Sequence, residues 1–200
     1  VEESLEPLKK EIALAPEAER SGIINLIPRQ YARIGNKKLA ADTVQEALEP
    51  YLRQPNTGAA AWTTVGRMRL AHDDTTTALN AVRQGVALDA QALGPALLAL
   101  ELMSRKVEGA ETIVQQALSR LNQPDLAMGY VRALIEQQRF DEAQQQLMSI
   151  TRQYPQLAEA WLVLGSMQFE MGQEQQAEAS LARYVELAEK TPNPNTSRGL

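Results

Sequence analysis

Cysteine is absent from this 200-residue sequence, histidine occurs once, and aromatic residues make up only 4% of the chain. Without cysteine there are neither disulfide bonds nor thiolate metal sites. The single histidine, His72, cannot supply a two-histidine metal site, an HExxH motif or a catalytic triad with a second partner. Sparse aromatic and β-branched residues argue against a sheet protein. The sequence therefore predicts a helical chain without catalytic machinery.

Long apolar runs and excess positive charge are missing as well. No run approaches the roughly 18 residues that a membrane-spanning helix needs. The net charge of −5 disfavours a nucleic-acid partner. The glycines are isolated, so no phosphate-binding loop is indicated, and the pair Asp73-Asp74 is better interpreted as a helix-capping turn than as paired acid–base carboxylates. We expect neither an enzyme nor a cofactor.

Good helix formers dominate what is present, and the clearest pattern lies between Ala158 and Pro192. This stretch is predicted to form two short amphipathic helices joined at Gly172, a residue that can adopt positive φ at a turn. Small residues would let the two helices approach closely, and large apolar ones would fill the space around them. The positions that mark the pattern are Trp161, Leu164, Gly165, Ala177, Leu181 and Tyr184.

The same spacing recurs earlier in the chain. Trp62 and Gly66 repeat the spacing of Trp161 and Gly165. Ala78 follows Trp62 by 16 residues, just as Ala177 follows Trp161 by 16. A helical hairpin of this kind cannot bury its apolar face alone, so recurring copies indicate a stack of repeats.

These residues and spacings resemble those of the tetratricopeptide repeat (TPR), a 34-residue helix–turn–helix unit. The resemblance implies an all-α fold, a right-handed α-solenoid of about five units over residues 21–190. The expected units are 21–54, 59–90, 91–122, 124–157 and 158–190, with an N-terminal helix in residues 1–20 that is half of a truncated repeat or a cap, and a linker at 191–200. Pro28 departs from the pattern, because a proline inside the first helix of a unit would kink it or leave a carbonyl free.

In this family the first helices line a concave groove that holds the ligand. Arginine recurs at one groove position in three of the units, which implies affinity for acidic groups; a solvated helix face is the alternative interpretation of these arginines. Carried onto this sequence, the groove residues are Asn25, Arg29, Arg33, Thr63, Arg67, Leu70, Met128, Arg132, Ile135, Leu162, Ser166 and Phe169. The lysines of the groove that clamps a C-terminal carboxylate are absent.

The resemblance thus implies a non-enzymatic protein-interaction scaffold whose groove binds a peptide or partner helix with acidic and apolar residues. Two alternatives stay open: a self-association module that pairs terminal repeat faces into a homo-oligomer, and a regulatory or targeting domain of a longer protein. Apolar residues on the last helix, such as Leu181 and Tyr184, favour further repeats beyond Leu200 or association there. Composition and repeat style are similar to those of long bacterial TPR proteins of the cell envelope.

Overall fold

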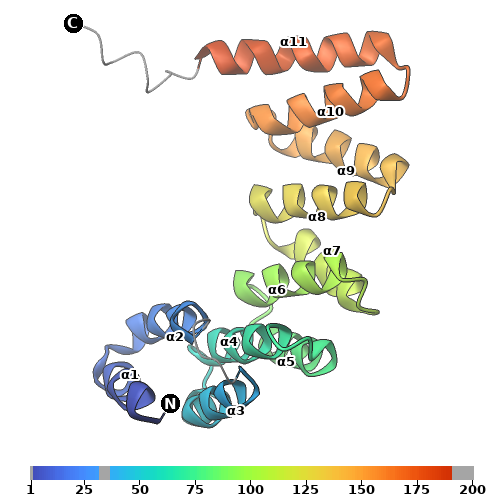
Figure 1. Cartoon of the computed structure of the whole chain (residues 1–200). Coiled ribbons are helices and arrows are strands. Elements are labelled where there is room, and N and C mark those ends of the chain that lie inside the picture. Colours follow the sequence, from blue (N-terminus) through green and yellow to red (C-terminus); the bar gives the residue numbers. More distant parts are fainter. Residues whose placement is uncertain (1, 32–36, 191–200) are drawn as a thin grey trace, which may run out of the picture. The chain divides into compact units, whose positions relative to one another are not determined.

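The computed structural model describes residues 2–31 and 37–190. Within these residues the chain forms eleven α-helices and one short 3-10 helix, and no strand (Figure 1). The predicted all-α repeat fold is therefore confirmed. The chain divides into two compact units, residues 1–122 and 123–200, which are described separately below. The predicted linker at 191–200 lies outside the described residues, and no helix among those described is long and apolar enough to cross a membrane.

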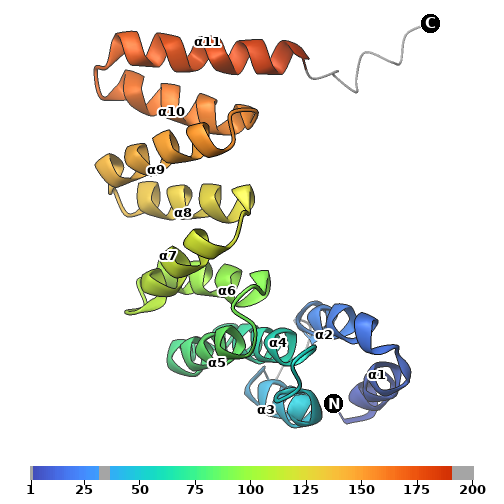
Figure 2. The same cartoon turned by 180° about the vertical axis from the view of Figure 1, so that it is seen from behind.

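Unit 1 holds the first seven α-helices, and Figure 2 shows them from behind. The helix α4 lies at the centre of this unit, because it packs against α2 and α6 as well as against its hairpin partner α5. The elements are α1 (Glu2–Leu14), α2 (Glu17–Tyr31), α3 (Lys37–Leu48), η1 (Glu49–Tyr51), α4 (Gly58–Leu70), α5 (Thr75–Leu88), α6 (Leu93–Ser104) and α7 (Ala110–Arg120).

A proline inside α2 is accommodated by a hydroxyl from α4. Pro28 has no N–H, so it cannot bond the carbonyl of Ile24 one turn earlier. That carbonyl instead accepts a hydrogen bond from Oγ1 of Thr64 at 3.1 Å. Both Ile24 (0% exposed) and Thr64 (1% exposed) are buried, so no water would otherwise satisfy the oxygen. The proline thus frees an acceptor, and the acceptor ties α2 to α4.

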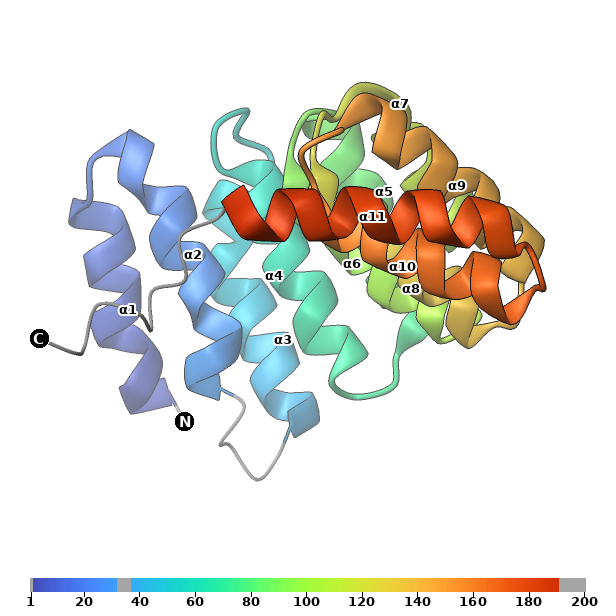
Figure 3. The same ribbon diagram turned by 90° about the horizontal axis from the view of Figure 1, so that it is seen from above.

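Unit 2 holds two helical hairpins. Its helices are α8 (Pro124–Glu136), α9 (Phe140–Gln153), α10 (Ala158–Glu170) and α11 (Glu174–Lys190). The view in Figure 3 looks onto α11, which packs on α10. A Cβ added at Gly165 of α10 would lie 2.7 Å from Cγ of Leu181, so only glycine allows this close approach. A buried hydrogen bond of 2.7 Å from Ser180 Oγ to Gln168 Oε1 joins the same two helices.

The predicted core residues are buried, with the tryptophans as partial exceptions. Eight positions of the two clearest repeats are expected in the core, the two tryptophans and six smaller or aliphatic residues. These six are all buried: Val65, Gly66, Ala78, Leu164, Gly165 and Ala177. Trp62 and Trp161 are only half-buried, because each indole reaches out of the core to a backbone carbonyl of the preceding connection. Trp62 Nε1 donates to Leu52 O at 3.0 Å, and Trp161 Nε1 donates to Pro155 O at 3.1 Å. Each tryptophan therefore also pins the connection that leads into its helix.

The same turn follows the first helix of four hairpins, namely α4, α6, α8 and α10. One residue of each turn has positive φ, and the next amide donates to the carbonyl five residues earlier, as Arg139 N does to Leu134 O at 2.9 Å. Asp74 then caps α5, as predicted, by accepting a bond from Thr77 N at 3.1 Å. The positive-φ residues are Asp73, Lys106, Gln138 and Gly172, so three of the four turns do without the glycine that this backbone favours.

The C-terminal end of α11 carries a small charge network. Glu186 accepts hydrogen bonds from Lys190 Nζ and from Arg183 Nη1, both at 2.6 Å. These two bonds, with Lys190 contributing most, lower the pKa of Glu186 from 4.5 to about 2. The carboxylate is fully exposed, so its stabilising effect is small and sensitive to salt.

Candidate functional site

A cavity of about 250 Å³ opens along the first helices of unit 1. It is bounded by α2, α4 and the start of α6, together with the connections that precede α4 and α6. This is the face on which the predicted groove lies. Its lining residues are Ser21, Asn25, Pro55, Asn56, Ala59, Ala60, Thr63, Asp89, Ala92, Leu93, Gly94 and Pro95.

The walls of this cavity are held by hydrogen bonds and close packing among its own residues. Ser21 Oγ of α2 donates to Asn56 O at 2.8 Å, which ties α2 to the connection before α4. Thr63 Oγ1 donates to Ala59 O at 2.7 Å, one turn back in α4. A Cβ at Gly94 would come within 2.9 Å of Thr63 Oγ1, so the start of α6 lies directly against α4. The cavity is therefore preformed rather than dependent on a ligand.

One polar side chain at the cavity remains available for a ligand. Asn25 is exposed and makes no hydrogen bond to another described residue. Its amide offers two donors and one acceptor, which is the pattern that a peptide group requires. The two predicted groove residues Asn25 and Thr63 are thus brought to the same cavity.

Arg67 lies one turn beyond Thr63 on the same face of α4. Its side chain is half-buried, and Nε of the guanidinium is buried without a hydrogen-bond partner among the described residues. A buried donor without a partner costs free energy. Because Nε itself is enclosed, an anionic ligand would meet this guanidinium through its other nitrogens. This arginine is therefore the predicted groove residue with the clearest unmet bonding capacity.

The neighbouring Arg69 is different, because its charge is already used within the protein. Its Nη2 donates to Asp42 Oδ1 and to Gln45 Oε1, each at 2.7 Å. A second cavity, of about 260 Å³, lies beside this group and is lined by Asp42, Gln45, Glu46, Glu49 and Arg69. We interpret this cluster as a tie between α3 and α4.

Several predicted groove residues do not lie at an accessible surface. Leu70 (3% exposed) and Met128 (2% exposed) are core residues, and Thr63 (1% exposed) lines the cavity only from within. For α4 the reason is that this helix packs against both α2 and α6, so positions on that face are covered. The side chain of Arg29 and the whole of Arg33 lie outside the described residues.

The remaining predicted residues belong to unit 2. Arg132 of α8 is exposed and forms an ion pair with Glu159 of α10 at 2.8 Å, while Ile135 is half-buried. The other three residues lie along one face of α10, and all are exposed: Leu162 (36%), Ser166 and Phe169 (66%). The sequence pattern missed the cavity residues outside the helix positions, such as Asn56 and Asp89, since connections have no fixed place in the repeat.

Metal chemistry finds no support in the described ranges, 2–31 and 37–190. They contain no group of three histidine, aspartate or glutamate side chains that could hold a metal ion. The candidate site is a surface with hydrogen-bonding and charged groups.

Comparisons with known proteins agree with this fold. Residues 101–164 match the family model described as "Tetratricopeptide repeat". BtubC (BKLC) from P. vanneervenii has a similar structure, with a TM-score of 0.63, 17% identity and coverage of 100% of this chain and 94% of that chain. The structure of the MamA protein is also similar, with a TM-score of 0.58 and 15% identity. The match covers 91% of this chain and 97% of that chain. YrrB, "a TPR protein with an unusual peptide-binding site", has a TM-score of 0.52 and 18% identity. That match covers 92% of this chain and 94% of that chain. No curated protein matches the sequence.

Proposed function

We propose that this chain, whose residues 101–164 match the tetratricopeptide repeat family, is a non-enzymatic scaffold whose unit 1 binds a peptide segment of a partner protein. The observation that carries the proposal is the preformed cavity along α2, α4 and α6, with the unused amide of Asn25 at its wall. Concave, largely preformed sites with a few convergent polar groups are typical of ligand binding.

The cavity favours an extended peptide over a compact small molecule. Its apolar walls come from small side chains, Ala59, Ala60 and Pro95, which leave room for a backbone to approach. The Asn25 amide can pair with the N–H and the C=O of one residue of an extended peptide, because those two groups point to the same side of the strand. The ligand would therefore be recognised partly through its main chain.

Arg67 specifies the charge of that peptide. Its guanidinium lies one turn from the cavity and lacks a partner for Nε among the described residues. A glutamate, an aspartate or a terminal carboxylate at that point would form a charge-assisted hydrogen bond. We therefore propose that the bound segment carries an acidic group next to a short stretch of small or apolar residues.

The test is selection from a displayed library of random 12-residue peptides, followed by affinity measurement on the intact protein. We expect acidic peptides to be enriched. Arg67→Ala should weaken their binding roughly 10-fold or more, since a hydrogen bond to a charged group contributes about 1.5–3 kcal/mol. Asn25→Ala should weaken binding severalfold, and raising the salt concentration should weaken binding of the original protein.

The matched control is Arg83→Ala. Arg83 is an exposed arginine of α5, so its removal changes the net charge equally on the second helix of the hairpin. Its affinity should stay within twofold of the original. Equal losses for Arg67→Ala and Arg83→Ala would reduce the effect to overall charge and contradict the proposed site, as would enrichment of basic peptides. Light scattering against protein concentration tests the self-association alternative.

A further inference from the structure

An apolar pocket of about 190 Å³ lies in unit 2, away from the residues that the repeat pattern selects. It is lined by Phe140, Met167, Glu170 and Met171, and we call it the Met–Phe pocket. Phe140 begins α9, and Met171 caps the C-terminus of α10. Both residues are unusually exposed for their size, at 46% and 38%. Such apolar exposure beside a pocket is typical of an interaction surface.

The pocket lies where two hairpin turns of unit 2 come to the same edge. The turn between α8 and α9 and the turn between α10 and α11 both lie there (Figures 1 and 2). A hydrogen bond of 2.6 Å from Gln144 Nε2 to Gln173 Oε1 joins α9 to the second turn. The backbone around the pocket is thus fixed, while the methionine side chains remain adaptable in shape.

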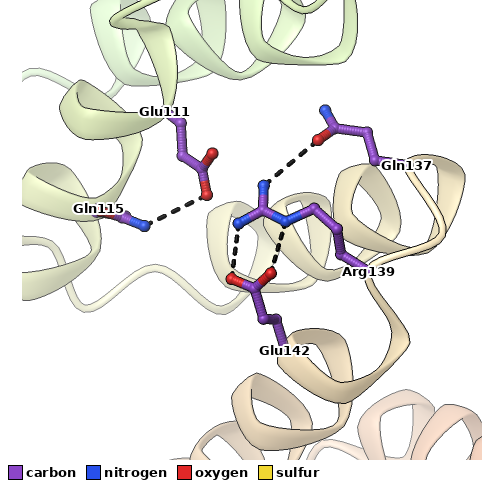
Figure 4. A network of polar contacts seen from close by, with 5 residues as sticks. All are labelled: Glu111, Gln115, Gln137, Arg139 and Glu142. Atoms are coloured by element: carbon purple, nitrogen blue, oxygen red, sulfur yellow. Dashed lines mark hydrogen bonds and ion pairs between the residues drawn. The ribbon is translucent and has the colours of Figure 1, made fainter.

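One carboxylate, Glu170, lines this pocket, and others lie on the two turns and the adjoining helix ends. The two turns and the adjoining helix ends carry one arginine, Arg139, and that cation is already used: its Nε and Nη2 both bond the Glu142 carboxylate at 2.7 Å (Figure 4). Figure 4 also shows Gln137 accepting a third bond from the same guanidinium, at 3.4 Å. Four further carboxylates form no ion pair with another described residue: Glu136, Asp141, Glu170 and Glu174.

We propose that the Met–Phe pocket binds a basic amphipathic segment of a partner protein, with an apolar anchor side chain in the pocket and lysine or arginine against the carboxylates. Glu170 lines the pocket itself, so a cation next to the anchor would meet it directly. The exposed ring of Phe140 can also receive a cation on its face. This surface is separate from the unit 1 cavity and selects the opposite charge, so it goes beyond the proposed function.

Charge decides between this occupant and a second copy of the chain. The net charge of the chain is −5, so two copies repel one another on average. An anionic edge next to an apolar pocket is complementary to a cationic amphipathic segment, which gains both apolar burial and charge attraction. The occupant is therefore a basic partner rather than a neighbouring molecule of the same protein.

The experiment uses the intact protein with ¹³C-labelled methionine methyl groups and a synthetic 14-residue peptide of leucine and lysine, amphipathic as a helix. We expect the methyl signals of Met167 and Met171 to shift on titration. Those of Met148, which is exposed to a similar extent (39%) on α9, should stay unchanged. A leucine–glutamate peptide of the same pattern should not bind.

Two variants and two matched controls complete the test. Met171→Ser and Glu170→Gln should each weaken peptide binding at least fivefold, whereas Met148→Ser and Glu178→Gln should leave it within twofold. The proposal is overturned if the Met148 signal moves as much as that of Met171, if the acidic peptide binds equally, or if 1 mM basic peptide moves no signal. Signals of Met167 and Met171 that shift with protein concentration alone would identify a second copy as the occupant instead. None of these variants touches the unit 1 cavity, so failure here leaves the proposed function standing.

Discussion

The hydrogen bond from Thr64 to the carbonyl of Ile24 makes a quantitative prediction. Thr64→Val keeps the shape of the side chain but removes the donor, so the buried Ile24 oxygen loses its partner. An unsatisfied buried acceptor costs about 1–3 kcal/mol. We therefore expect the free energy of unfolding to fall by about that amount. The exposed hydroxyl of Thr76 provides a control, because Thr76→Val should change stability by less than about 0.5 kcal/mol.

The stability lost in Thr64→Val depends on whether residue 28 is a proline. In Pro28→Ala the restored N–H can bond the Ile24 carbonyl along the helix, so the hydroxyl of Thr64 is no longer the sole donor. Thr64→Val should then cost little in the Pro28→Ala background. The double-mutant cycle should give a coupling energy of about 1–2 kcal/mol between two residues 36 positions apart in the chain.

The assay is urea unfolding of the four proteins, followed by circular dichroism at 222 nm. A lower midpoint with an unchanged slope reports lost stability rather than a changed unfolded state. Additive costs, with a coupling energy within about 0.3 kcal/mol of zero, would refute the view that the hydroxyl replaces the missing proline N–H.

Three further predictions concern the hairpins. Gly165→Ala should lower the free energy of unfolding by about 1 kcal/mol, since overpacking against Leu181 outweighs the gain in helix propensity. Gly22→Ala should raise it by up to about 1 kcal/mol in the same urea assay, because the added Cβ would meet nothing within 4 Å. Gln138→Gly should raise the melting temperature by about 2–4 °C, because glycine tolerates the φ of 60°. The contribution of Glu186 is present above pH 4.5 and is lost as pH falls towards 2. A carboxyl NMR titration should show the lowered pKa of Glu186, and Glu186→Gln should remove that contribution to stability over this pH range.

The repeat architecture was predictable from sequence because it depends on local spacing. The interval between Trp62 and Ala78 sets how the two helices of a hairpin meet, and Trp161 and Ala177 repeat it. The first interval falls on α4 and α5, and the second falls on α10 and α11. Pro28 was recognised as an exception that would free a carbonyl, but the residue that accommodates it, Thr64, belongs to another hairpin and could not be read from local pattern.

The binding surface was less predictable, because exposure depends on neighbouring helices. Thr63 occupies a groove position in the repeat, yet Gly94 brings α6 against it and covers it. Met128 is buried as well, although its position in the pattern matches that of exposed Leu162. The exposure of Met171 was not foreseen either, since it lies in a turn to which the pattern assigns no role.

The order of helix contacts has a mechanical consequence. Among the described residues, the helices that share extensive contacts are adjacent in the chain or separated by one helix. Within each unit, tension would therefore not be resisted by contacts between helices distant in the chain, and the hairpins would separate from their neighbours one after another. Releasing a hairpin such as α10–α11 would lengthen the chain by roughly 100 Å. Under load, the helices within each unit would therefore separate one hairpin at a time.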